Sequence, residues 1–127
     1  MEKILKIEET TFNLKDYYGY DGYQIVTEKQ TIKLGISNSQ SCCEQWGYFM
    51  SNDDISDFIG SDFIKLETTD VCLNSKELDG LYYPNTMFVN IYTTKGMLQF
   101  VAYNSHNGYY GHDAVIFSDE YKHNESL

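Results

Sequence analysis

The sequence contains no arginine, a single proline and only short apolar runs. Without arginine the chain lacks the planar, bidentate group that commonly binds phosphate or carboxylate. No apolar run exceeds four residues, so we expect no membrane-spanning helix. Residues 1–6 lack the apolar core of a secretory signal, so we expect no such signal. Three cysteines, two of them adjacent, are odd in number and favour a reducing compartment over a disulfide framework.

The chain is instead rich in acidic and aromatic residues. Its 127 residues include 19 Asp and Glu against nine Lys, which gives a net charge of −10, and 16% are aromatic. This charge repels phosphate backbones, so we expect no direct binding to free DNA or RNA. The acidity has two interpretations: it keeps the protein soluble, or it docks on a basic, nucleic-acid-binding face of another protein.

The apolar pattern predicts an α+β fold, with residues 1–127 forming a single domain around a mostly antiparallel sheet. We expect strands at 4–7, 23–27, 31–36, 63–68, 71–73, 87–94, 97–103 and 113–117. One hairpin joins 23–27 to 31–36, and a Lys95-Gly96 turn joins 87–94 to 97–103.

One short helix is predicted at 51–60 and would pack on this sheet. Ser51 is its cap, acidic residues lie in its first turn, and Gly60 ends it. Segment 74–85 is predicted to be an exposed loop, and the polar tail at about 118–127 is predicted to fray.

Two segments concentrate reactive side chains. The first holds Cys42 and Cys43, and the second holds His106 and His112 on either side of an Asn-Gly turn signal. This signal predicts a hairpin over 100–117 that brings the two histidines together. Thiolates from a neighbouring loop would complete a tetrahedral zinc site.

Adjacent cysteines constrain this zinc prediction, because neighbouring side chains on a strand point to opposite faces. Both would reach one ion only from a tight turn or a helix start. Two alternatives stay open: a single cysteine with Glu44 or Asp113 as a further ligand, or packed cysteines and hydrogen-bonded histidines without metal.

Other side chains suggest binding more than catalysis. A cysteine with His and Asp nearby could form a thiol nucleophile with its general base and orienting group. The sequence has no phosphate-binding loop, paired-carboxylate signature or Cys-x-x-Cys motif, so we do not expect an enzyme. A nucleotide pocket would have to use Lys15 or Lys33 for phosphate. The residues predicted to contact a partner are Trp46, Asp53, Asp54, Asp57, Tyr109 and Tyr110. The alternative is a solvated acidic face and tyrosines packed at strand edges.

Three stretches carry a resemblance to a known group of proteins: Tyr-Tyr-Gly-Tyr-Asp-Gly-Tyr at 17–23, Gln-Ser-Cys-Cys-Glu-x-Trp-Gly-Tyr at 40–48, and Phe-Val-Ala-Tyr-Asn-Ser-His-Asn-Gly-Tyr-Tyr-Gly-His at 100–112. The chain resembles small acidic proteins encoded by phages and mobile elements of Gram-positive bacteria, some of which are similar to anti-CRISPR inhibitors. The resemblance implies a protein of the host cytoplasm and directs attention to Cys42, Cys43, His106 and His112.

These observations predict an anti-CRISPR protein that binds a type II Cas effector nuclease or its guide complex. An acidic, aromatic-rich surface would block nucleic-acid binding or cleavage, because such nucleases carry a basic channel. Zinc would brace the predicted hairpin, and a homodimer is compatible with the tyrosine content. Two alternatives are a sponge that sequesters a cyclic or adenine-derived nucleotide signal, and a thiol-dependent enzyme.

Overall fold

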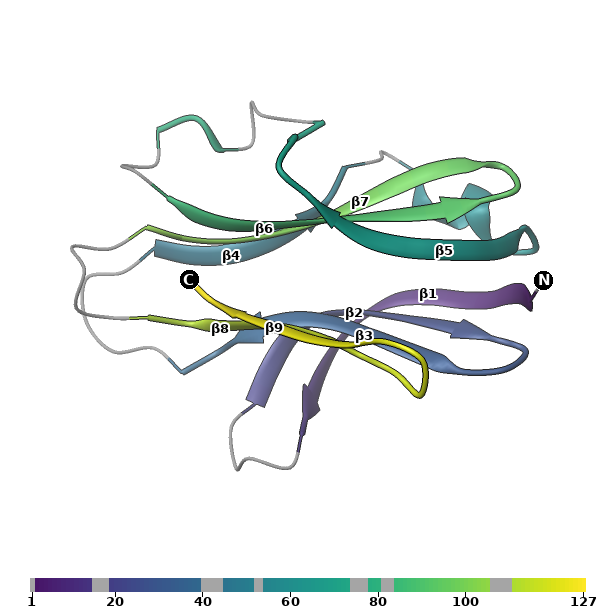
Figure 1. The fold of residues 1–127 in the computed structure, drawn as a ribbon, viewed down its shortest axis with the longest axis horizontal. Coiled ribbons are helices and arrows are strands. Elements are labelled where there is room, and N and C mark those ends of the chain that lie inside the picture. Colours follow the sequence, from purple (N-terminus) through teal and green to yellow (C-terminus); the bar gives the residue numbers. More distant parts are fainter. Residues whose placement is uncertain are drawn as a thin grey trace.

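A computed structural model describes residues 2–14, 19–39, 45–51, 54–73, 78–80, 84–105 and 111–127. Its strands are β1 (Glu2–Asn13), β2 (Gly19–Thr27), β3 (Thr31–Ser37), β4 (Gln45–Met50), β5 (Asp62–Thr69), β6 (Asn85–Thr93), β7 (Gly96–Ser105), β8 (Asp113–Phe117) and β9 (Lys122–Ser126). All pairings are antiparallel, in the order β4-β7-β6-β5-β1-β2-β3-β8-β9. Figure 1 shows them folded into two layers, with β4 to β7 in one and the remaining strands in the other.

The core lies between the layers and follows from period-two alternation along the strands. In β3 the side chains of Ile32, Leu34 and Ile36 are fully buried, while Lys33 between them is half-buried on the other face. β6 alternates in the same way, burying Met87, Val89 and Ile91. Each strand therefore supplies one apolar face, and the two faces meet to form the core.

The layers are joined where β1 meets β5 in a short ladder that pairs Glu2 with Phe63 and Lys3 with Asp62. The Glu2 side chain is buried there and accepts hydrogen bonds from the Thr27 hydroxyl and, at 2.8 Å, from Gln30 Nε2. These donors belong to the end of β2 and the β2–β3 turn. The buried carboxylate thus ties the seam between the layers to the first hairpin.

The α+β prediction is wrong, because 69% of the described residues lie in strands and 5% are helical. Within the described part of the predicted helix 51–60, the helical residues are those of a 3₁₀ turn, η1 (Ile55–Phe58). Ser51 does not cap it: its amide donates to the Gln99 carbonyl at 2.9 Å and its hydroxyl accepts from the Gln99 amide at 3.1 Å, which extends the β4–β7 pairing. Asp54 is the cap instead.

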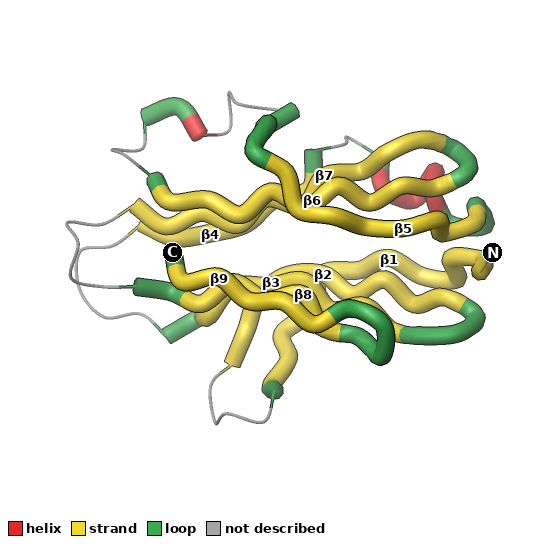
Figure 2. The backbone as a smooth tube through the Cα atoms, viewed as in Figure 1, coloured by secondary structure: helices red, strands yellow, loops and turns green. Residues whose placement is uncertain are grey.

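The predicted hairpin over 100–117 is also wrong. β7 pairs with β4 and β6, whereas β8 pairs with β3 and β9 in the other layer. β7 and β8 therefore lie in different layers, as Figure 2 shows. The histidine pair was expected on two arms of one hairpin, and that geometric basis for the zinc prediction is lost.

Two further segments differ from expectation. Residues 71–73 form no strand, and Gln99 holds them instead: Leu73 N donates to Gln99 Oε1 at 2.9 Å, and Gln99 Nε2 donates to the Val71 carbonyl at 2.7 Å. The tail expected to fray contains β9, which pairs along its length with β8. Leu127 follows β9 and is only 5% exposed.

The two short hairpins are confirmed. β2 pairs with β3, and β6 pairs with β7. The second turn lies one residue earlier than predicted, at Thr94 and Lys95, with Gly96 opening β7 at a φ of 139°. The predicted strands 63–68 and 113–117 are found as β5 and β8.

Candidate functional site

His112 is the one predicted zinc ligand within the described residues. Its side chain is 2% exposed, its Nδ1 lies 2.7 Å from the Ser37 carbonyl, and its ring stacks on Trp46 with centroids 5.2 Å apart. Its backbone exchanges two hydrogen bonds with Leu127. Because a carbonyl can only accept, Nδ1 carries the proton, and a metal would have to bind through Nε2.

The other predicted ligands, Cys42, Cys43 and His106, lie outside the described residues. Within the described ranges no group of three His, Cys, Asp or Glu side chains is placed to hold a metal ion. His112 itself occupies a structural position, joining the start of β8 to β3, to the β4 tryptophan and to the C-terminal residue. The zinc site stays a prediction.

The three described members of the predicted partner-binding set do not form one patch. Trp46 pairs with Asn104 near the end of β7. Asp54 and Asp57 belong to η1 and its cap, which lie near Gly96 at the start of β7. Figure 2 shows η1 at the end of the molecule where the N-terminus lies. The remaining three, Asp53, Tyr109 and Tyr110, fall outside the described residues.

A different set of side chains comes together where β4 faces β1 and β2. We call Glu9, Asp21, Tyr23 and Tyr48 the carboxylate–tyrosine cluster. The Tyr48 hydroxyl donates to Glu9 Oε2 at 2.9 Å, and the Tyr23 and Tyr48 rings meet edge to face at 5.8 Å. Glu9 and Tyr23 are paired residues of β1 and β2, so their side chains share a face.

Hydrogen bonds fix the second carboxylate of the cluster. Asp21 Oδ1 accepts from the Thr11 hydroxyl at 2.9 Å and from Asn38 Nδ2 at 3.0 Å. No lysine forms an ion pair with Glu9 or Asp21 in the described part of the chain, where the lysine pairs are Lys6 with Glu8 and Lys65 with Glu67. The cluster thus presents negative charge that no described cation neutralises.

The cluster also perturbs its tyrosines. Burial raises the pKa of Tyr48 well above 10.0, and the hydrogen bond to Glu9 and the nearby charges of Glu9 and Asp21 raise this pKa further. Burial, followed by the charge of Glu9, likewise raises the pKa of Tyr23. Both phenols therefore stay protonated at neutral pH, and the Tyr48 hydroxyl donates to Glu9.

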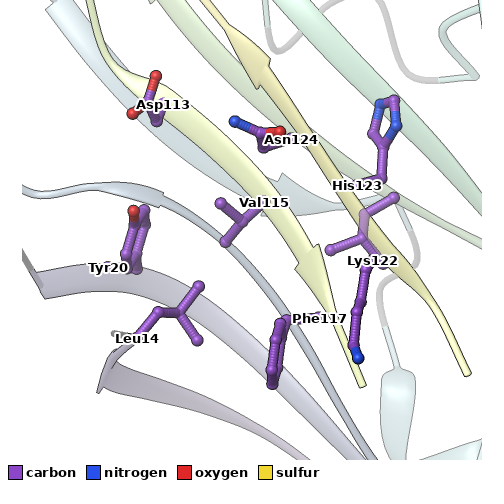
Figure 3. Close-up of a pocket in the computed structure, with 9 residues that line it drawn as sticks. Leu14, Tyr20, Asp113, Val115, Phe117, Lys122, His123 and Asn124 are labelled. Carbon is purple, nitrogen blue, oxygen red and sulfur yellow. The ribbon is translucent and has the colours of Figure 1, made fainter. Parts of the chain in front are cut away.

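A second site lies on the outer face of the β1-β2-β3-β8-β9 layer. The far ends of β1 and β2 bend away from the opposite layer, as Figure 1 shows, and meet β8 and β9 around a pocket of about 350 Å³. Figure 3 shows Leu14, Tyr20, Val115 and Phe117 around it, with Asp113 and Asn124 toward one end and Lys122 toward the other. We call this the outer-face pocket.

Close packing shapes the floor of the outer-face pocket. Phe12 and Tyr20 stack with centroids 5.5 Å apart. A Cβ on Gly35 would lie 2.9 Å from the Phe12 ring, so the glycine lets that ring lie flat on the sheet. The Tyr-Gly-Tyr-Asp-Gly-Tyr run is the sequence feature that points to this aromatic pocket. It does not predict that β8 and β9 complete the pocket, because these strands are separated from the run by most of the chain.

No helix in the described ranges is both long enough and apolar enough to cross a bilayer. The described residues define an all-antiparallel, two-layered β protein with an unneutralised carboxylate–tyrosine cluster on one flank and an aromatic pocket on an outer face. The chain belongs to the family described as a domain of unknown function, DUF7448, whose model matches residues 1–116. Comparisons with curated proteins and with solved structures gave no match.

Proposed function

We propose that the protein acts by binding and inhibits a type II Cas effector nuclease of its host, as an anti-CRISPR protein. The carboxylate–tyrosine cluster carries this proposal. It places two carboxylates without a described cationic partner beside two phenols, and so offers both charge and aromatic contact area to a basic surface.

The chemistry of the cluster fits a lysine- or arginine-rich partner. Glu9 is exposed and Asp21 is half-buried, so both carboxylates are close enough to the surface to meet a cation while Thr11 and Asn38 keep Asp21 oriented. Tyr48 is half-buried, and its hydrogen bond to Glu9 and its contact with Tyr23 already order the ring. Docking would therefore bury the rest of the ring at little entropic cost. The net charge of −10 would speed association with the basic nucleic-acid channel of such a nuclease.

The test is DNA cleavage by purified, guide-loaded type II nucleases in the presence of the protein, together with measurement of association rates. We expect inhibition, with an association rate that falls as ionic strength rises. Replacing Glu9→Lys together with Asp21→Asn should weaken inhibition by about a hundredfold, because two charged contacts of roughly 1.5 kcal/mol each are lost.

A matched control variant carries the same change in charge elsewhere. Glu120→Lys with Asp119→Asn alters two exposed residues of the β8–β9 turn and should inhibit almost as well as the wild type. Equal loss in both variants would mean that net charge alone matters and would remove the cluster from the proposal. Absence of binding and inhibition with every type II nuclease tested would overturn the proposed function itself.

A further inference from the structure

We propose that the outer-face pocket is a small-molecule site for a nucleoside monophosphate whose base carries an exocyclic amine, with AMP as the simplest example. The pocket lies on the opposite face of the β1-β2-β3-β8-β9 layer from the core, away from the carboxylate–tyrosine cluster, which is on the core-side face. The inference therefore goes beyond the proposed inhibitor function and does not depend on it.

Strand register fixes the order of side chains across this face. Lys33 of β3 pairs with Phe117 of β8, and Phe117 pairs with Lys122 of β9. Paired residues share a face, so the three form one row in which Phe117 lies between the two lysines. Side chains on one face of a strand recur every two residues. On the same face as Phe117, Val115 therefore comes next and pairs with Asn124, and Asp113 follows and pairs with Ser126.

We assign the anion-binding end to this row: Lys122 lines the pocket, and Lys33 lies beside the pocket, across Phe117 from Lys122. The Lys33 ammonium lies 5.6 Å from the centre of the Phe12 ring, and the Lys122 ammonium lies 6.0 Å from that of Phe117. Neither lysine has a carboxylate partner within the described residues. In a chain with 19 acidic residues, two neighbouring unpaired lysines over aromatic rings make a local positive site, and its complement is a phosphate.

The middle of the pocket is apolar and suits a planar ring. Val115 and Tyr20 are buried and form the floor, and Phe117 is 38% exposed, which leaves part of its ring for contact with a ligand. Figure 3 shows these side chains around the pocket, while the His123 ring points away from it. His123 instead contacts Glu125 at 2.9 Å.

The far end of the pocket is polar and of opposite charge. Asp113 is exposed and has only acceptor atoms when ionised, and the Asn124 amide offers both a donor and an acceptor. An amine on the base satisfies Asp113, and a ring nitrogen accepts from Asn124. Residues four apart along a strand are separated by about 13 Å, so the acidic and basic ends are far enough apart for one nucleotide to span.

The volume sets the size of the ligand. About 350 Å³ lies at the lower end of the range for small-molecule sites, which fits one nucleotide and not a cofactor with two. Of the functions that the sequence left open, capture of an adenine-derived signal is the one that would use such a site. The binding itself is testable without reference to that role.

The test is calorimetric titration of the intact protein with AMP, adenosine and IMP. We expect saturable binding of AMP, with adenosine at least about tenfold weaker because the phosphate contacts are absent, and IMP weaker because a carbonyl replaces the amine that faces Asp113. Lys33→Gln with Lys122→Gln should weaken AMP binding by about a hundredfold and leave adenosine binding unchanged. Phe117→Ala should weaken both ligands.

Two controls keep the result specific. Lys29→Gln with Lys95→Gln removes the same charge from two exposed turn residues and should bind AMP like the wild type. Glu9→Lys with Asp21→Asn should also retain AMP binding, so the nucleotide site and the inhibitor surface can fail separately. No saturable binding at millimolar AMP, equal affinities for AMP and adenosine, or full affinity after loss of Lys33 and Lys122 would overturn the proposal.

Discussion

Individual residues of the carboxylate–tyrosine cluster set its chemistry, and their coupling can be measured. Glu9 accepts a 2.9 Å hydrogen bond from the Tyr48 hydroxyl. Burial raises the pKa of both tyrosines of the cluster, and the charge of Glu9 raises each pKa further. We predict that Glu9→Gln lowers the pKa of Tyr48 toward 10.0, because an amide still accepts the hydrogen bond but carries no charge. Absorbance titration of phenolate at alkaline pH measures this change.

The same substitution should change the dependence of stability on pH. A tyrosine whose pKa is raised by folding contributes stability that is fully present below the unfolded pKa of about 10 and is lost as the pH rises toward the folded pKa. The wild type should therefore lose stability between about pH 10 and 11, and Glu9→Gln should lose less. Urea unfolding at both pH values gives the comparison, with Glu125→Gln as the control. Equal losses of stability in Glu9→Gln and Glu125→Gln would show that the charge of Glu9 is not coupled to the tyrosine pKa values.

At the scale of single residues, sequence patterns identified reactive side chains but not their surroundings. His112 is predicted from sequence to be a zinc ligand, whereas in the structure its ring contacts Ser37 and Trp46, which lie 75 and 66 positions earlier in the chain. No local pattern encodes such contacts. The carboxylate–tyrosine cluster was missed for the same reason: Glu9, Asp21 and Tyr48 come from three strands that meet only after folding.

At the scale of elements, a pair of glycines allows β2 and β3 to approach closely. Gly22 pairs with Gly35, and a Cβ on Gly22 would lie 1.9 Å from the Leu34 carbonyl oxygen and 2.6 Å from the Gly35 Cα. We predict that Gly22→Ala destabilises the protein by about 3 kcal/mol or more, since backbone and not a flexible side chain occupies the space. Gly111→Ala is the control, because its nearest neighbour would be 3.4 Å away. Thermal unfolding of the two variants tests the difference.

Gln99 shows how one strand residue organises the segment above it. This side chain is fully buried and contacts the Val71 carbonyl, the Leu73 amide and Asn90 Oδ1. We predict that Gln99→Ala costs about 2–3 kcal/mol and releases residues 71–73 from the sheet. Hydrogen exchange at the Leu73 amide should then accelerate by orders of magnitude more than exchange within β6. Unchanged protection at Leu73 would mean that other contacts hold the segment. The control is Gln45→Ala, which alters an exposed residue of β4.

Elements with strong local signals were predicted well. The hairpins β2–β3 and β6–β7 combine alternating apolar residues with turn residues close by, so sequence alone finds both strands and partner. The helix at 51–60 failed because pairing of Ser51 with Gln99 competes with capping, and Asp54 begins only the 3₁₀ turn. β9 was missed because Lys122 to Ser126 are polar edge residues with no apolar alternation.

At the scale of the whole molecule, one apolar core is shared by two layers. Among the described strands, the β1–β5 ladder is the only strand pairing between these layers, and side-chain hydrogen bonds such as that from Tyr48 to Glu9 also join them. Sequence patterns predicted a mostly antiparallel sheet, but they did not indicate which strand belongs to which layer. β7 and β8 are consecutive and yet belong to different layers, while β1 pairs with β5 across an interval of about 50 residues. Such pairings depend on packing of the complete core and have no local signature.

This shared core predicts that the layers unfold together even when their seam is weakened. Glu2 is buried at the seam, and Glu2→Ala removes the acceptor of Gln30 Nε2 and one of the two acceptors of the Thr27 hydroxyl, which should cost about 2 kcal/mol. Trp46, the only tryptophan, stacks on His112 across the two layers near the other end of the molecule and reports on their contact by fluorescence. In urea, fluorescence and far-ultraviolet circular dichroism should give coincident transitions, both shifted equally to lower urea in Glu2→Ala. Transitions that separate in the variant would instead show that each layer is stable alone and that the seam, not the core, couples them.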